Sequence, residues 1–527
     1  AGARTWADFT DANCYATPKT AVASITSGWT SSDQIIVLDG TYSFNSIDFG
    51  AVAAPTGTHI QIVGQSNDPD ACILQSTVAT SPMININTSG GVSYTVAFSG
   101  MTFKKTVAYT TNASGVFTHF PQAAHGDMTF TDCKFVDTTL TIAVTSVYAF
   151  FSVGSSGTRT LTFTRTVFSG LTSTSLGGVC FAGCVPSGCA VVFDDCDFNT
   201  ITHDNTVSAG FAGGFSAVLA LTITNCRVDG IDIDSKGTTA LACYPFFYST
   251  VSLTVNGLTA NNCVIAGGSC GPAVAYTTGP WQWNDIYITN CSSTPATDVN
   301  TTGGTFLANG PSAQGSGSNI VVDNCISSHG VGFYAAQGGG GTVSNIRVYR
   351  STSRVNAIIS ASGWGDFAMD DFQIVDCKTG TIIDPSDAGL GGGIYAHNHA
   401  TQATRVAVRS FTNGQIIGVT NHRSGGYNAI YVRNGNSTYA HNVHIANVYC
   451  DTPNEKKTTG VKLIGFSETA GCALNLTGSA NTINGGQNAV FEDFSGTGAH
   501  AMADFVDIGS TRRGVVLGSS VERRAAA

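Results

Sequence analysis

The chain has 527 residues, of which 11% are charged, and its formal net charge is −10. An acidic chain without a basic stripe does not suit a nucleic-acid partner, because phosphates need Lys and Arg to neutralise them. No apolar run reaches the roughly 18 residues that cross a bilayer, so we expect no membrane span.

The first 50 residues differ from the rest of the chain. They begin at Ala1 without a recognisable signal peptide, as expected of a processed or recombinant form. The stretch Asp8–Thr26 predicts a short helix, and Ile35–Gly40, rich in β-branched residues, predicts a first strand. We interpret residues 1–50 as an N-terminal cap that covers the open end of the repeats that follow.

From residue 60 to about residue 480 one short phrase recurs. It has apolar residues at alternate positions, then Asn or Asp, then Cys, and its clear copies start at Met128, Leu221, Ile286, Ile320 and Phe372. Weaker copies start at Ile60, Val96, Leu161, Val191, Leu253, Ile346, Val406, Val443 and Leu474. Alternation with a period of two predicts strands with one buried face. Successive starts lie 26 to 37 residues apart, which predicts stacked coils.

Sixteen Cys would fit a disulfide scaffold, but their positions favour another role. Six occupy one position of the phrase: Cys133, Cys196, Cys226, Cys291, Cys325 and Cys377. Stacking would bring them into one interior column, where a free Cys behaves as a small apolar side chain. A Cys184–Cys189 disulfide in a Gly-rich loop is left open, and the nearby Cys spacing fits no zinc pattern.

Asn225, Asn290 and Asn324 share another position, just before the turn. We expect their amides to bond from coil to coil and their backbones to be left-handed. With these ladders the chain resembles the right-handed parallel β-helix (pectin lyase-like) superfamily of polysaccharide lyases and phage tailspike depolymerases. The resemblance implies an all-β, single-stranded right-handed parallel β-helix of about 12–14 coils over residues 51–480. The residues after the repeats predict a last strand at Phe491–Phe494 within a C-terminal cap, residues 481–527. The resemblance also implies a homotrimer.

The outward positions change in character along the repeats. Early coils present Thr, as at Thr129 and Thr162, which suits a solvated strand. Later coils present Tyr287, Asp323, Arg347, Tyr349, Arg409 and His444. If Ile394 and Ala396 face the core, a second strand presents Tyr334, Tyr395, His397, His399, Tyr431, Arg433 and Lys462, and a nearby turn carries His422, Arg423 and Tyr427.

Polysaccharide lyases of this fold use Tyr, His, Arg and Lys on one face, so the resemblance implies a groove from about residue 287 to residue 462. Arg or Lys would neutralise a uronate carboxylate, and Tyr, His or Lys would then remove the acidified C–H proton. The candidate catalytic residues are Tyr395, His397, Tyr431, Arg433 and His422. The candidate substrate-binding residues are Arg423, Tyr427, Lys462, His399, Tyr334, Tyr349, Arg409 and Trp364. The alternative is a solvated surface on which tyrosines stack for stability.

A carboxylate pair would instead indicate glycoside hydrolysis, with the pair about 5 Å apart in retaining enzymes and about 6.5–9.5 Å apart in inverting ones. The candidates are Asp366, Asp370, Asp371, Asp384 and Asp387, although Asp is also a common turn residue. Trp281, Trp283 and Trp364 are candidate stacking platforms for sugar rings, or covers for the core.

No motif indicates a cofactor, and calcium is left open. His397 and His399 make a poor metal site because no carboxylate lies beside them.

These patterns predict a glycan-binding and glycan-cleaving protein outside the cell, either secreted or on a virion surface. A polysaccharide lyase or depolymerase acting on an acidic polysaccharide or cell-surface glycan fits best. A non-catalytic structural or adhesion fibre is the alternative, favoured by the Thr-lined early coils, and a glycoside hydrolase is the second alternative.

Overall fold

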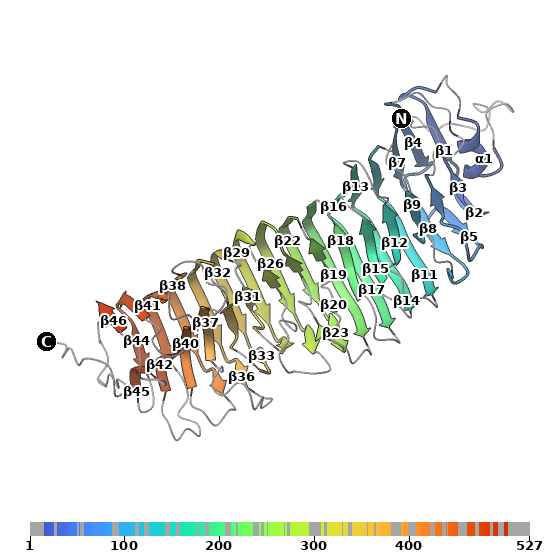
Figure 1. Ribbon diagram of the computed structural model, residues 1–527. Helices are drawn as coiled ribbons and strands as arrows, with labels where there is room; N and C mark the ends of the chain where they lie inside the picture. Colours follow the sequence, from blue (N-terminus) through green and yellow to red (C-terminus); the bar gives the residue numbers. More distant parts are fainter. Residues whose placement is uncertain are drawn as a thin grey trace. The chain divides into compact units, whose positions relative to one another are not determined.

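A computed structural model describes residues 15–25, 29–49, 52, 57–86, 94–110, 115–120, 126–142, 148–153, 159–175, 179–184, 189–205, 212–217, 220–235, 242–243, 247–249, 251–267, 269–270, 275–294, 307–309, 313–328, 330–335, 340–355, 357–362, 365–380, 392–398, 407–421, 427–434, 439, 441–451, 461–468, 474–484, 488–493 and 500–503. The chain divides into two compact units, Ala1–Asp232 and Ile233–Ala527. In each unit, parallel strands of successive coils stack on one another, and Figure 1 colours them in chain order. The predicted all-β parallel β-helix is therefore confirmed.

The first unit opens with α1 (Pro18–Ala23), which lies inside the predicted helical stretch. Thr17 caps it: its hydroxyl accepts from the Thr20 N–H at 3.3 Å, and the Thr20 hydroxyl accepts from the Thr17 N–H at 3.2 Å. Pro18 at the first helical position has no N–H that would need a partner. The predicted first strand is present as β1 (Gln34–Val37). The predicted boundaries of the caps stay predictions.

Two parallel sheets make up the first unit. The larger one contains β1, β2 (Gly40–Phe44), β4 (His59–Gly64), β5 (Cys72–Ser76), β7 (Thr95–Ser99), β8 (Thr102–Lys105), β10 (Met128–Thr131), β11 (Lys134–Ile142), β13 (Arg159–Thr164), β14 (Val167–Ser175), β16 (Cys189–Asp194), β17 (Asp197–Asn205) and β19 (Ala220–Ser235), in which the division between the units falls. The smaller one has one strand per coil: β3 (Ile47–Asp48), β6 (Ile84–Asn85), β9 (Thr118–Phe120), β12 (Tyr148–Val153), β15 (Val179–Cys184) and β18 (Ala212–Ala217).

The second unit repeats this plan. Its larger sheet contains β22 (Leu253–Asn261), β23 (Val264–Gly267), β26 (Trp281–Thr289), β27 (Ser292–Thr294), β29 (Gln314–Asp323), β30 (Ile326–Ser327), β32 (Gly340–Tyr349), β33 (Thr352–Ser353), β35 (Phe367–Val375), β36 (Lys378–Thr379), β38 (Ala407–Ile417), β39 (Thr420–Asn421), β41 (His441–Asp451), β43 (Leu474–Ser479), β44 (Thr482–Asn484) and β46 (His500–Ala503). The one-per-coil sheet contains β21 (Phe247–Ser249), β25 (Ala275–Thr277), β28 (Leu307–Asn309), β31 (Phe333–Ala335), β34 (Ile359–Ser362), β37 (Gly392–Asn398), β40 (Tyr427–Asn434), β42 (Val461–Glu468) and β45 (Asn488–Asp493). A short pair is formed by β20 (Ala242–Cys243) and β24 (Ser269–Cys270). The predicted last strand at Phe491–Phe494 overlaps β45.

Most copies of the repeated phrase pair in register as predicted. In the first unit Met128 pairs with Val96 and Leu161, and in the second unit Ile320 pairs with Ile286 and Ile346. Three weaker copies are wrong, because Leu253, Val443 and Leu474 do not belong to this column; the start at Val406 lies outside the described residues. The residues that continue the column are Leu258, Gly414 and Val448.

The error has a structural cause at a corner inside the long strands of the second unit. Asp285, Asn319, Asn345, Asp371, Asn413 and Asn447 have φ between 51° and 56°. The ladder skips them, as when Asn284 pairs with Ser318 and Ile286 with Ile320. Each is an unpaired bulge at which the strand bends. Apolar and polar residues alternate both before and after the corner. The sequence pattern alone therefore does not show to which half of the strand a copy of the phrase belongs.

The predicted Asn ladder is confirmed at a second corner. Asn225, Asn290 and Asn324 have φ of 50°, 53° and 52°, the left-handed region that Asn tolerates. In the second unit Asn290 Nδ2 donates to Asn261 Oδ1 at 3.0 Å, and Asn324 Nδ2 donates to Asn290 Oδ1 at 2.8 Å. In the second unit this corner is therefore fixed by backbone conformation and by amide bonds from coil to coil.

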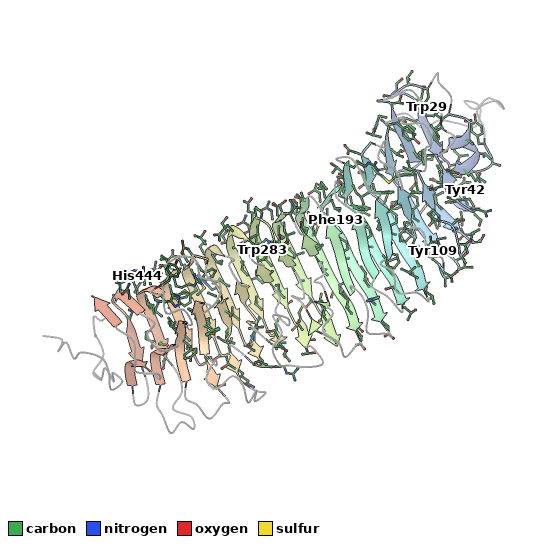
Figure 2. The ribbon with its side chains drawn as sticks, viewed as in Figure 1. Trp29, Tyr42, Tyr109, Phe193, Trp283 and His444 are labelled. Carbon is green, nitrogen blue, oxygen red and sulfur yellow. The ribbon has the colours of Figure 1, made fainter. Side chains whose placement is uncertain are left out.

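The interiors of the two units differ in their large side chains. In the first unit Phe98, Phe130, Phe163 and Phe193 stack coil on coil, with centroids 5.1–5.3 Å apart (Figure 2 labels Phe193). In the second unit Trp281 and Trp283 are 4% and 0% exposed, so the interpretation of both as sugar platforms is wrong and that of core covers holds. The six predicted interior cysteines are confirmed as free and buried.

Candidate functional site

The predicted catalytic centre lies on β37 and β40. Their register pairs Tyr395 with Tyr431 and His397 with Arg433, so the structure brings these four positions together as predicted. The two tyrosine rings stack with centroids 5.8 Å apart and an interplanar angle of 16°.

The predicted exposure of the tyrosines is wrong, because both are only 4% exposed. They form a buried cluster with Ala357, while Ile394 and Ala396, at alternate positions, are fully buried as well. Strand alternation puts the tyrosines on the opposite face from Ile394 and Ala396. The sheet is therefore covered on both faces here, and a substrate cannot lie directly on the tyrosines.

Several other predicted site residues cannot be assigned a geometry. Outside the described residues lie His399, His422, Arg423, Trp364, Asp384 and Asp387. The backbones of five more are in described strands but their side chains are not described: Tyr334, His397, Tyr427, Arg433 and Lys462. The same holds for Cys184 and Cys189, so their disulfide stays a prediction.

Arg409 is a further correction. It was expected to face outward, but it is 1% exposed and pairs with Phe367 and Val443 in an inward-facing column. Its Nη1 donates to the backbone carbonyl of Gly365. A guanidinium buried in this way holds the coil together and is not available to a substrate.

Unlike the sheet around Tyr395 and Tyr431, the larger sheet of the second unit has an outer face with side chains that solvent reaches, such as Tyr287 and Gln415. One register column runs over six coils: Tyr287, Val321, Arg347, Gln373, Gln415 and Tyr449. It faces outward because its chain neighbours, such as Ile286 and Ile346, are fully buried. Tyr287 is 52% exposed, the largest exposure among the exposed apolar or aromatic side chains described. Neighbouring coils are about 4.8 Å apart, so the column is about 24 Å long.

We call Tyr287, Arg347, Tyr349, Gln373, Gln415 and Tyr449 the tyrosine–glutamine face. Tyr349 lies two residues after Arg347, and its hydroxyl donates to Gln373 Oε1 at 2.9 Å. Arg347 donates from Nη1 to the Asp371 carbonyl at 2.6 Å and from Nη2 to Asp371 Oδ1 at 2.7 Å. Nearby, Arg350 Nε donates to Asp323 Oδ1 at 2.9 Å. Both arginines are thus matched by an aspartate.

The described candidate carboxylates all hold structural bonds. Asp371 is bound to Arg347, and Asp366 Oδ1 accepts the Val408 N–H at 3.0 Å. The Thr412 hydroxyl, 2.6 Å from Asp370 Oδ1, and then the Asn413 amide hold the pKa of Asp370 below its ordinary value. A hydrolase needs one carboxyl whose pKa is raised so that it can donate a proton. Asp370 has the opposite property.

Three members of the tyrosine–glutamine face were missed from sequence. Gln373, Gln415 and Tyr449 were not singled out, because Gln carries no chemical signature and the copies near Val406 and Val443 were placed in the wrong column. Correct placement of the bulges would have aligned them with Tyr287. His444, labelled in Figure 2, lies on β41 before the corner, where its Nδ1 is 3.0 Å from Thr477 Oγ1.

In the described part of the chain, no group of three or more side chains suits a metal ion, and no helix is long and apolar enough to cross a membrane. No protein-family profile matches the chain, and no curated protein matches it. Among solved structures, the catalytic domain of a GH87 alpha-1,3-glucanase in complex with nigerose matches with a TM-score of 0.25 and 11% identity. The match covers 91% of this chain and 64% of that one.

Proposed function

We propose that the protein binds an extended glycan along the tyrosine–glutamine face. The observation that carries this proposal is the in-register column in which outward-facing tyrosine, arginine and glutamine side chains recur at the coil spacing, with Tyr287 and Gln415 exposed and the others half-buried. The apolar faces of sugar rings pack on aromatic rings, and their hydroxyls bond to amide and guanidinium groups. A linear polymer fits a column about 24 Å long better than a compact ligand does.

The binding test uses a panel of neutral and acidic polysaccharides and compares the native chain with Tyr287→Ala. We expect the variant to bind its glycan about 5- to 10-fold more weakly, since an aromatic contact is worth about 1 kcal/mol. Tyr15→Ala is the matched control, because Tyr15 is also exposed, at 44%, but lies in the first unit. Absence of glycan binding by the native chain across the panel would refute the proposal.

Cleavage is the second part of the proposal, in the form of a polysaccharide lyase or depolymerase acting on an acidic polymer. It is supported by the register that sets His397 beside Arg433 on β37 and β40. In this reaction Arg433 neutralises the uronate carboxylate and His397 takes the C–H proton; the electron pair of that bond forms the C=C bond as the C–O bond breaks, and an acid protonates the leaving glycosidic oxygen. The buried tyrosines, two residues earlier on the same face of each strand, would support the strands and not touch the polymer.

Cleavage is tested by following the ultraviolet absorbance of the new C=C bond and the appearance of reducing ends. We expect His397→Ala and Arg433→Ala to abolish both signals while glycan binding and thermal unfolding stay unchanged. Binding without either signal would identify the alternative, a structural or adhesion protein. Reducing ends without the absorbance would identify a hydrolase.

We also propose that the protein acts outside the cell, secreted or on a virion surface, where such polymers lie. The homotrimer stays part of this proposal, and the molar mass measured by light scattering tests it.

A further inference from the structure

Gln373 is the central polar residue of the tyrosine–glutamine face. The register places it between Arg347 on β32 and Gln415 on β38. Tyr349 lies diagonally across, because its own register partner is Val375, and its hydroxyl reaches Gln373 Oε1 at 2.9 Å. This bond links two coils at the middle of the exposed face.

The bond determines which atoms Gln373 can offer to a ligand. A glutamine amide has one acceptor oxygen and two N–H donors. The Tyr349 hydroxyl donates to one of the two lone pairs of the oxygen and fixes the orientation of the amide, so that its N–H groups are left for another partner. Arg347, locked by Asp371 at 2.6 and 2.7 Å, has only donors as well. The two adjacent side chains therefore form a fixed group of donors.

We propose that Tyr349 is a positioning residue that holds Gln373 as a donor toward an acceptor-only oxygen of the bound glycan. An N-acetyl carbonyl and a uronate carboxylate share this chemistry, because neither has a proton to give at neutral pH. Asp371 balances the charge of Arg347, so the carboxylate gains no unpaired cation at this place. This inference rests on the proposed glycan binding and adds the kind of sugar group that the face selects.

The test is a double-mutant cycle on Tyr349→Phe and Gln373→Ala, read as glycan affinity. We expect Tyr349→Phe alone to weaken binding about 3- to 10-fold, the effect of one hydrogen bond. In the Gln373→Ala background, Tyr349→Phe should cause no further loss of glycan affinity, because Tyr349 acts through the Gln373 amide. An equal loss in both backgrounds would show that Tyr349 contacts the glycan itself and would overturn the inference.

Two further variants sharpen the result. Gln373→Glu keeps the shape and the bond from Tyr349 but has no N–H, so we expect a loss of more than tenfold for N-acetylated and uronate polymers alike. Tyr42→Phe, in the first unit, removes a hydroxyl elsewhere and should leave the affinity unchanged. Separate N-acetylated and uronate glycans identify the source of the oxygen. If the native chain binds and Tyr287→Ala weakens binding while Tyr349→Phe does not, only this inference fails; if nothing binds, the proposed function fails.

Discussion

At the residue scale, the first unit contains an imidazole that is kept neutral by its surroundings. His203 on β17 is 6% exposed, and its Nδ1 is 2.5 Å from Ser173 Oγ on the neighbouring strand β14. Burial lowers the pKa of His203 to about 4, against a smaller opposing effect of Asp204. A protonated His203 would be a buried cation, which is costly in an interior lined with phenylalanine.

This pKa predicts how stability depends on pH. In the unfolded chain the imidazole titrates near 6.5, so between pH 6.5 and 4 the unfolded state binds more protons than the folded state. The free energy of unfolding should therefore be constant above pH 6.5 and fall by up to about 3 kcal/mol as the pH drops to 4. Urea unfolding from pH 7.5 to 4 measures it.

His203→Gln is the matched variant, because it keeps a polar side chain beside Ser173 but cannot titrate in this range. Its pH curve should be flatter than that of the native chain by the same amount. Identical slopes for the two proteins would show that His203 does not cause the acid sensitivity.

At the scale of the element, the corners change the direction of the chain, as hairpin turns do in antiparallel sheets. Asn290 shows both parts of the device: a left-handed backbone with φ of 53°, and amide bonds to Asn261 and Asn324 at 3.0 and 2.8 Å. The conformation costs an ordinary residue about 1–2 kcal/mol, and each amide bond contributes about 0.5–1.5 kcal/mol.

The two parts can be separated by two substitutions of Asn290. Asn290→Gly keeps the conformation and loses the ladder, so we expect a loss of about 1–2 kcal/mol in the free energy of unfolding. Asn290→Ala loses both and should cost about 2–4 kcal/mol. Denaturant unfolding ranks them, and equal values for the two variants would mean that backbone conformation contributes nothing at this corner.

The same corners explain how far the sequence could predict the structure. Period-two alternation predicted the strands because it depends only on neighbours within one strand, and the recurring Asn and Cys positions predicted the stacking because they repeat from coil to coil. Around Arg409 the alternation of inward and outward positions, counted from Val406, was off by one residue. A shift of one residue exchanges the two faces of a strand, and in the structure Val408 is 44% exposed whereas Arg409 is buried. The covering of Tyr395 depends on contacts between distant residues, which no local pattern encodes.

At the scale of the whole molecule, the buried cysteines show which small side chains fill the interior of the coils. The sequence has 16 Cys, and in the described part of the chain nine of them form no disulfide and are all buried. In the second unit the N–H of Cys263 donates to Cys291 Sγ, and the N–H of Cys291 to Cys325 Sγ, both at 3.4 Å. The thiols thus serve as small polarisable side chains that accept backbone bonds between coils.

Such thiols should be unreactive until the coils open. Burial raises the pKa of Cys133 and Cys377 to about 12, so almost no thiolate exists at pH 8, and alkylating reagents attack the thiolate. We expect iodoacetamide to leave both unmodified in the native protein and to modify both in denaturant, as measured by peptide mass spectrometry. Lys378→Cys, at an exposed position, should react at once and serves as the internal standard. Native-state labelling of Cys133 or Cys377 at the rate of that standard would mean that the coils open locally far more often than a packed solenoid allows.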